Sequence, residues 1–84
     1  MSSKDRKILI AILQEPARSD VHWKEIENLF KTLGAYVTEG SDSHVRVALK
    51  RVRAVFHRPH LQKVTDKGAL KSVRRFLITA GVKL

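Results

Sequence analysis

The chain contains no cysteine among its 84 residues. This absence excludes a disulfide framework and a thiolate zinc site, and it fits a protein of the reducing cytoplasm. Aromatic residues make up only 6% of the chain. The longest apolar run, Ile8 to Leu13, is too short for the core of a signal peptide and far too short for a membrane span of about 20 residues. We therefore expect no membrane partner.

Acidic residues are scarce relative to basic ones. Seventeen Lys and Arg against eight Asp and Glu give a formal net charge of +9, and the basic residues are spread over the whole chain. Such a charge favours a polyanionic partner such as nucleic acid, although it also suits a protein that pairs with an acidic protein. The length allows one domain, residues 1–84, with a single sheet layer and two or three helices but no deep enzyme cleft.

The most regular pattern lies between Ser43 and His60, where apolar residues alternate with basic residues or histidine. A period of two predicts half-buried strands. If the chain reverses at Lys50-Arg51, the apolar pairs on one face are Leu49 with Val52, Val47 with Ala54, and Val45 with Phe56. The opposite face then carries His44, Arg46, Arg53 and His57, with His44 directly across from His57.

That second face suits phosphodiesters. Guanidinium groups offer forked donors to phosphate, and histidine loses or accepts a proton near neutral pH. Binding and acid–base chemistry are therefore both available there. The arrangement depends on the register, because a slip of one residue would turn His57 into the core.

An N-terminal helix is predicted from Ser3 to Glu15, with Ser3 as its cap and Pro16 as its stop. Its apolar residues are contiguous, so Ile10 and Ala11 fall outside the buried stripe. The commoner explanation is a buried core helix. The alternative is that another chain covers this helix, either a second copy or a protein partner.

Two further helices flank the strands. The first opens at Asp20 as cap and stops at Gly34, with Lys24, Glu27, Asn28 and Lys31 facing water. Ala35 to Glu39 reads as a strand, and Pro59 ends the third strand. The last helix opens at Asp66 and stops at Gly81. Its polar face carries Lys67, Lys71, Arg74 and Arg75, which either face water or extend an electropositive surface.

The predicted order is helix, helix, three antiparallel strands, helix. This order predicts an α+β fold with the helices on one face of a three-stranded sheet. The opposite sheet face stays open, and that open face is where His44 and His57 project.

The segment from Val21 to Val82 resembles the HicA toxins of bacterial toxin–antitoxin pairs. The matching motifs are Ser43-His44 for the family's Gly-Ser-His, His57-Arg58-Pro59-His60 for its Pro/His element, Lys67-Gly68-Ala69-Leu70 for Lys-Gly-Thr-Leu, and Ala80-Gly81-Val82 for Ala-Gly-Leu. Asp42 departs from the family's glycine, and residues 1–19 precede the usual start. The chain therefore resembles a divergent branch, with an N-terminal helical extension over 1–19 and a core over 20–84.

The resemblance implies a fold like the double-stranded RNA-binding domain and a ribosome-independent messenger RNA interferase activity. It implies His44 as the catalytic residue. It also implies a HicB-type antitoxin that covers the active face, and a place in the bacterial cytoplasm. A basic toxin and an acidic blocking surface would be electrostatically complementary.

For metal-independent cleavage without a cofactor, His44 serves as base, Arg46 and Arg53 contact phosphate, and His57 or His60 serves as acid. Further candidates for RNA binding are Lys50, Arg51, His60, Lys71 and Arg74. A zinc ion held by His44, His57 and His60 is a weaker alternative, because no carboxylate or thiolate joins them.

Two other functions compete with the nuclease. A non-catalytic module would bind structured RNA through the same fold and charge. A DNA-binding subunit is disfavoured, because the last helix stands alone after a long loop. Tyr36 and Trp23 are the only large amphipathic rings, so we expect weak sequence selectivity.

Overall fold

The fold is known from a computed structural model that describes residues 1–14, 20–41, 43–59 and 63–84. Its elements are α1 (Ser3–Leu13), α2 (Trp23–Thr32), β1 (Tyr36–Glu39), β2 (His44–Leu49), β3 (Val52–His57) and α3 (Lys67–Thr79). The predicted α+β class and element order are confirmed. None of the described helices is long and apolar enough to cross a bilayer.

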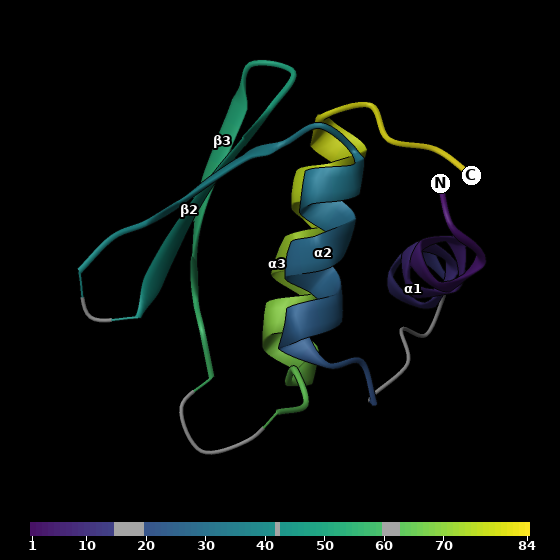
Figure 1. The fold of residues 1–84 in the computed structure, drawn as a ribbon, viewed down its shortest axis with the longest axis horizontal. Helices are drawn as coiled ribbons and strands as arrows, with labels where there is room; N and C mark the ends of the chain where they lie inside the picture. Colours follow the sequence, from purple (N-terminus) through teal and green to yellow (C-terminus); the bar gives the residue numbers. More distant parts are fainter. Residues whose placement is uncertain (15–19, 42, 60–62) are drawn as a thin grey trace.

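The elements form three layers (Figure 1). The sheet has the strand order β1-β2-β3, and both neighbouring pairs are antiparallel. Helices α2 and α3 pack against one face of this sheet, and α1 packs against α2 and α3. The second face of the sheet, called the outer face below, is covered by none of the described helices.

The core forms where the inner face of the sheet meets α2 and α3. Phe30 of α2 is fully buried, with its ring centroid 5.8 Å from that of Phe56 and 5.7 Å from that of Phe76. Val45 and Val47 of β2 are also buried. This aromatic cluster joins α2, α3 and β3 in one contact region.

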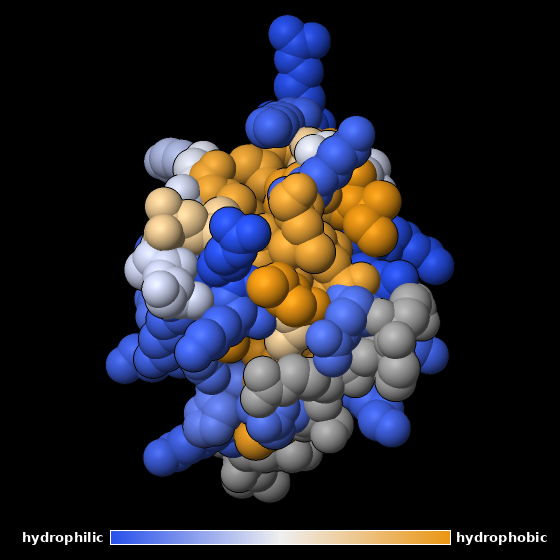
Figure 2. All heavy atoms as spheres, turned by 90° about the vertical axis from the view of Figure 1, so that its right-hand side faces the viewer, coloured by the Kyte–Doolittle hydropathy of each residue, from blue (hydrophilic) through white to orange (hydrophobic). Residues whose placement is uncertain are grey.

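Helix α1 adds a second region of burial behind α2 and α3. Ala11 is only 1% exposed and Ile12 is fully buried, so the expectation that Ala11 falls outside the buried stripe is wrong. Ile10 is the outward apolar residue of the helix, at 38% exposed. The side of the molecule on which α1 lies shows a gathering of hydrophobic side chains surrounded by hydrophilic ones (Figure 2).

The predicted helix starts need two corrections. Ser2, not Ser3, caps α1, and its hydroxyl accepts a hydrogen bond from the Asp5 amide at 3.1 Å. Helix α2 begins at Trp23 with His22 as its cap, not at Asp20. The reason is a long-range backbone pairing, because Val21 accepts from Thr65 at 2.7 Å and Trp23 donates to Lys63 at 3.0 Å. This pairing keeps His22 extended, so the helix cannot begin before Trp23.

The start of α3 and the ends of α2 and α3 agree with the sequence. The Asp66 carboxylate accepts from the Ala69 amide at 2.7 Å and caps α3. Gly34 and Gly81 follow α2 and α3 with φ of +87° and +86°, a conformation that glycine adopts without strain. Helix α1 ends at Leu13 instead of Glu15. The proposed stop at Pro16 lies outside the described residues.

The hairpin has the predicted register. Leu49 pairs with Val52, Val45 with Phe56, and His44 with His57. The turn residues Lys50 and Arg51 both have positive φ, at 48° and 71°. A two-residue turn of this kind favours Asn-Gly, because a side chain with a β-carbon is strained there.

The turn provides a test of the hairpin geometry. Replacing Lys50→Asn together with Arg51→Gly is expected to raise the free energy of unfolding by about 1 kcal/mol, because it relieves the left-handed strain. Urea unfolding measures this change. The matched control, Lys50→Gln with Arg51→Gln, removes the same charges and should gain nothing. Equal gains in both variants would mean that charge, not backbone strain, sets the effect.

Candidate active site

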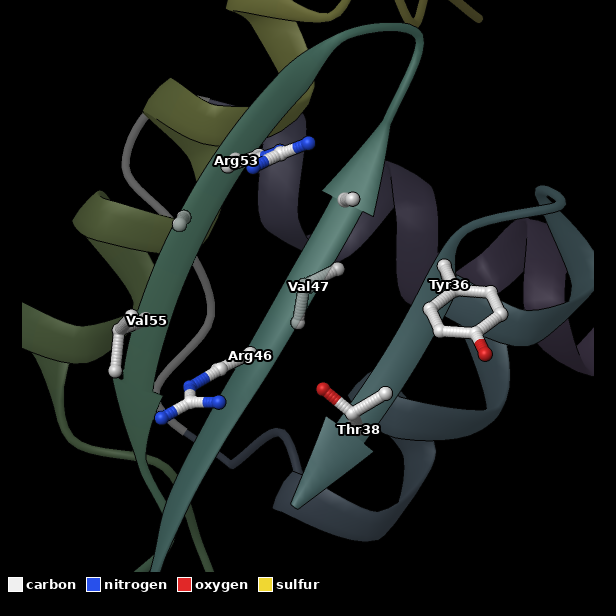
Figure 3. A pocket seen from close by; sticks show the side chains of 8 residues that line it. Tyr36, Thr38, Arg46, Val47, Arg53 and Val55 are labelled. Atoms are coloured by element: carbon white, nitrogen blue, oxygen red, sulfur yellow. The ribbon is translucent and has the colours of Figure 1, made fainter. Parts of the chain in front are cut away.

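The outer face of the sheet has three rows of residues, two of which run across β1, β2 and β3, while the third begins at Gly40, directly after β1. The register gives these rows as Tyr36-Ala48-Arg53, Thr38-Arg46-Val55 and Gly40-His44-His57. The first two rows line a shallow concavity, which Figure 3 shows from close by. The third row lies at one end of the sheet. The rows bring histidine, arginine and an exposed aromatic ring onto one open surface.

His44 is held by a specific hydrogen bond. Its Nδ1 lies 2.7 Å from the carbonyl oxygen of Ser41. A carbonyl oxygen only accepts, so the neutral imidazole carries its proton on Nδ1 and leaves the lone pair on Nε2. The Ser41 carbonyl oxygen therefore selects the tautomer whose Nε2 can accept a proton.

His57 lies against His44, as the sequence predicted. The two ring centroids are 4.1 Å apart, with the planes tilted by 53°. A phosphate group does not fit between rings at this distance. A phosphodiester that uses both imidazoles must therefore lie over the pair.

Gly40 completes the histidine row, and the sequence reasoning missed this role. Its amide donates to the His44 carbonyl oxygen at 2.8 Å, which extends the β1–β2 ladder by one residue. A β-carbon at Gly40 would lie 3.4 Å from the His44 β-carbon and 3.6 Å from Nε of Arg46. Both separations are ordinary van der Waals contacts, so a side chain at Gly40 would pack directly against His44 and Arg46.

The two arginines of the outer face lie at different distances from the histidine pair. Arg46 is in the row next to His44, whereas Arg53 is four residues from His57, about 13 Å along the strand. Neither guanidinium forms an ion pair with any residue that the structure describes. Both are available to anions, but Arg53 is too far away to share a phosphate with His57.

The remaining candidates do not all reach this face. Lys50 and Arg51 form the exposed tip of the hairpin. Lys71 and Arg74 belong to α3, which packs against the inner face of the sheet, so they do not join the histidine pair. His60 lies outside the described residues, and with it the zinc alternative. Elsewhere in the described ranges, no three side chains of His, Cys, Asp or Glu cluster as metal ligands.

Behind the histidine row, Arg58 joins three elements. Its guanidinium donates to Glu27 of α2 at 2.6 Å and to Glu39 of β1 at 3.0 Å, and its amide donates to the Ser43 carbonyl oxygen at 2.9 Å. The expectation that Glu27 faces water is therefore wrong, since its side chain is only 17% exposed. The hydrogen bonds to Glu27 and then to Glu39 raise the pKa of Arg58 further above its ordinary value.

The position of Arg58 in the sequence already indicates that it needs a partner. It follows Phe56 by two residues, so strand alternation directs its side chain to the inner side of the sheet. A charged group on that side requires a partner of opposite charge. The sequence does not show which helix supplies this carboxylate, because the contact joins distant segments.

An open cationic sheet face that carries a histidine of defined tautomer suits a polyanion such as nucleic acid and offers a group for acid–base chemistry. Residues 23–82 match the family model of the HicA toxins of bacterial toxin–antitoxin systems. The chain belongs to this family, and α1 precedes the matched region. Comparison with curated proteins and with solved structures gives no match. Family membership makes the chain a toxin with a cognate antitoxin partner, in a family whose members are generally ribonucleases.

The ion pairs of Arg58 with Glu27 and Glu39, called the Arg58 bridge, are expected to stabilise the fold. Arg58→Leu should lower the free energy of unfolding by about 1–3 kcal/mol, because it leaves the partly buried Glu27 without its donor. Urea unfolding measures the loss, and Arg58→Lys should retain part of the stability. Lys31→Leu on the exposed side of α2 is the matched control. If Arg58→Leu costs no more than Lys31→Leu, the bridge does not hold β3 to α2.

Proposed function

We propose that the chain is the toxin endoribonuclease of its pair and cleaves messenger RNA without a metal ion, with His44 as the general base. The observation that carries this proposal is the hydrogen bond from Nδ1 of His44 to the Ser41 carbonyl oxygen. It leaves Nε2 of an accessible imidazole ready to take a proton. The neighbouring cations supply attraction for the RNA backbone.

The chemistry requires no group beyond the RNA and the protein. Nε2 of His44 takes the proton of a ribose 2′-hydroxyl, and the 2′-oxygen forms a bond to the adjacent phosphorus. The bond from phosphorus to the 5′-oxygen breaks, and a protonated imidazole donates its proton to that oxygen. The products are a 2′,3′-cyclic phosphate and a 5′-hydroxyl.

His57 is the acid in this scheme, because its exposed ring lies against His44. Arg46, in the adjacent row, stabilises the charge that develops on the phosphorane. His60 is the second candidate for the acid. Lys50 and Arg51 at the hairpin tip contact RNA beyond the cleaved bond.

The partner we propose is a HicB-type antitoxin of the bacterial cytoplasm that covers the outer face with acidic residues. Opposite charges on the two proteins would speed their association and block RNA at the same time. The apolar side of α1 offers a second surface for the antitoxin or for another copy of the chain.

The central test compares the wild type with His44→Ala on a long, weakly structured messenger RNA in chelator. We expect the rate of cleavage to fall by roughly 10²–10⁴-fold, as for the loss of a general base. RNA affinity, measured in parallel, should stay within about twofold, because the arginines remain. His22→Ala removes an exposed imidazole at the start of α2 and should cleave like the wild type.

The outcomes separate the competing functions. Binding without cleavage by either protein would favour the non-catalytic RNA-binding module. Equal cleavage by the wild type and His44→Ala would remove His44 from the mechanism. Full activity of His57→Gln would leave the base in place and assign the acid to another group.

A further inference from the structure

Tyr36 is the most exposed large hydrophobic side chain of the outer face. It is 74% exposed, whereas the tryptophan and the three phenylalanines are all buried. A tyrosine in β1 with its ring outside the core contributes little to folding by burial. Its position therefore requires an explanation other than stability.

The surroundings of Tyr36 suit a planar apolar ligand. In Figure 3 the ring of Tyr36 turns its broad face toward the viewer, and no other labelled side chain covers it. The next position in its row is Ala48, whose small side chain keeps the surface low between Tyr36 and Arg53. Val55, 57% exposed, continues the apolar floor in the next row.

The same concavity is lined by cations. Arg46 and Arg53 both border it, and the Arg53 side chain extends toward β2 in Figure 3. A ligand that combines a flat apolar ring with flanking negative charge matches this lining. Nucleotides of single-stranded RNA have these properties, because their bases are free to stack on aromatic rings while their phosphates meet arginine.

We propose that Tyr36 is a base-stacking subsite for single-stranded RNA, with Arg53 and Arg46 on the phosphates that flank the stacked base. The ring lies two rows from the histidine pair, about 13 Å along the strands, so the stacked base belongs to a different nucleotide from the one that is cleaved. Only this relation to the cleaved bond rests on the proposed function. Duplex RNA cannot use the subsite, since its bases are already stacked and paired.

The test measures affinity in a His44→Ala background, so that the RNA stays intact. Single-stranded oligonucleotides and a matched hairpin duplex are titrated against Tyr36→Ala and Tyr36→Phe. Tyr36→Ala should weaken single-strand binding roughly 5- to 100-fold, as expected for the loss of one stacked base, and Tyr36→Phe should bind like the parent. Duplex binding should not change. Ile78→Ala on α3, also an exposed apolar residue, is the control and should alter neither affinity.

A fluorescent base shows which nucleotide of the oligonucleotide stacks on Tyr36. When 2-aminopurine is moved one position at a time along the oligonucleotide, one position should lose fluorescence on binding, and this quenching should disappear with Tyr36→Ala. Unchanged single-strand affinity in Tyr36→Ala would overturn the subsite. An equal loss for single strand and duplex would also overturn it.

The result is independent of catalysis. If Tyr36→Ala weakens single-strand binding but no variant cleaves RNA, the subsite stands and the nuclease proposal fails. If His44→Ala abolishes cleavage while Tyr36→Ala binds and cleaves like the wild type, the nuclease proposal stands and the subsite fails. An effect of Tyr36→Ala on binding of the antitoxin alone would assign the ring to the protein partner and contradict the RNA subsite.

Discussion

The structure depends on the register between β2 and β3. This one pairing puts Val45 and Phe56 into the core and puts their chain neighbours His44 and His57 together on the open face. A shift by one residue would exchange the two faces. The apolar core is therefore also what holds the candidate catalytic pair in position, because burial of Phe56 against Phe30 and Phe76 fixes the register.

The arginines near the histidine pair fall into two groups, one paired with carboxylates and one unpaired within the described part of the chain. Arg58 lies behind the histidine row with its charge matched by Glu27 and Glu39, so it holds elements together. Arg46, one row from His44, has no carboxylate partner among the residues described. Placing α1 behind α2 and α3 lets a chain of 84 residues bury a second apolar region while one face of the sheet stays open. The helical side of the molecule therefore provides the buried core, and the opposite side provides the cationic surface.

The sequence predicted those features that arise from local periodicity. Alternation in the hairpin was sufficient for the register and for the contact between His44 and His57, and Asp66 and Gly81 marked the ends of α3. The errors came from contacts between distant segments. The pairing of residues near Val21 with residues near Thr65 moved the start of α2, and the ion pair of Glu27 with Arg58 crosses from a helix to the sheet. The sequence did not mark Gly40, because a glycine has no functional group and its contact with His44 is made by the backbone.

The most direct test of the account is the chemical identity of the RNA ends. The purified protein is incubated with messenger RNA in chelator, and the new ends are analysed by mass spectrometry and by their susceptibility to cyclic phosphodiesterase. A histidine base acting on the 2′-hydroxyl predicts 2′,3′-cyclic phosphate together with 5′-hydroxyl ends. Products with 5′-phosphate and 3′-hydroxyl ends would contradict it, because they require attack by water instead of by the ribose.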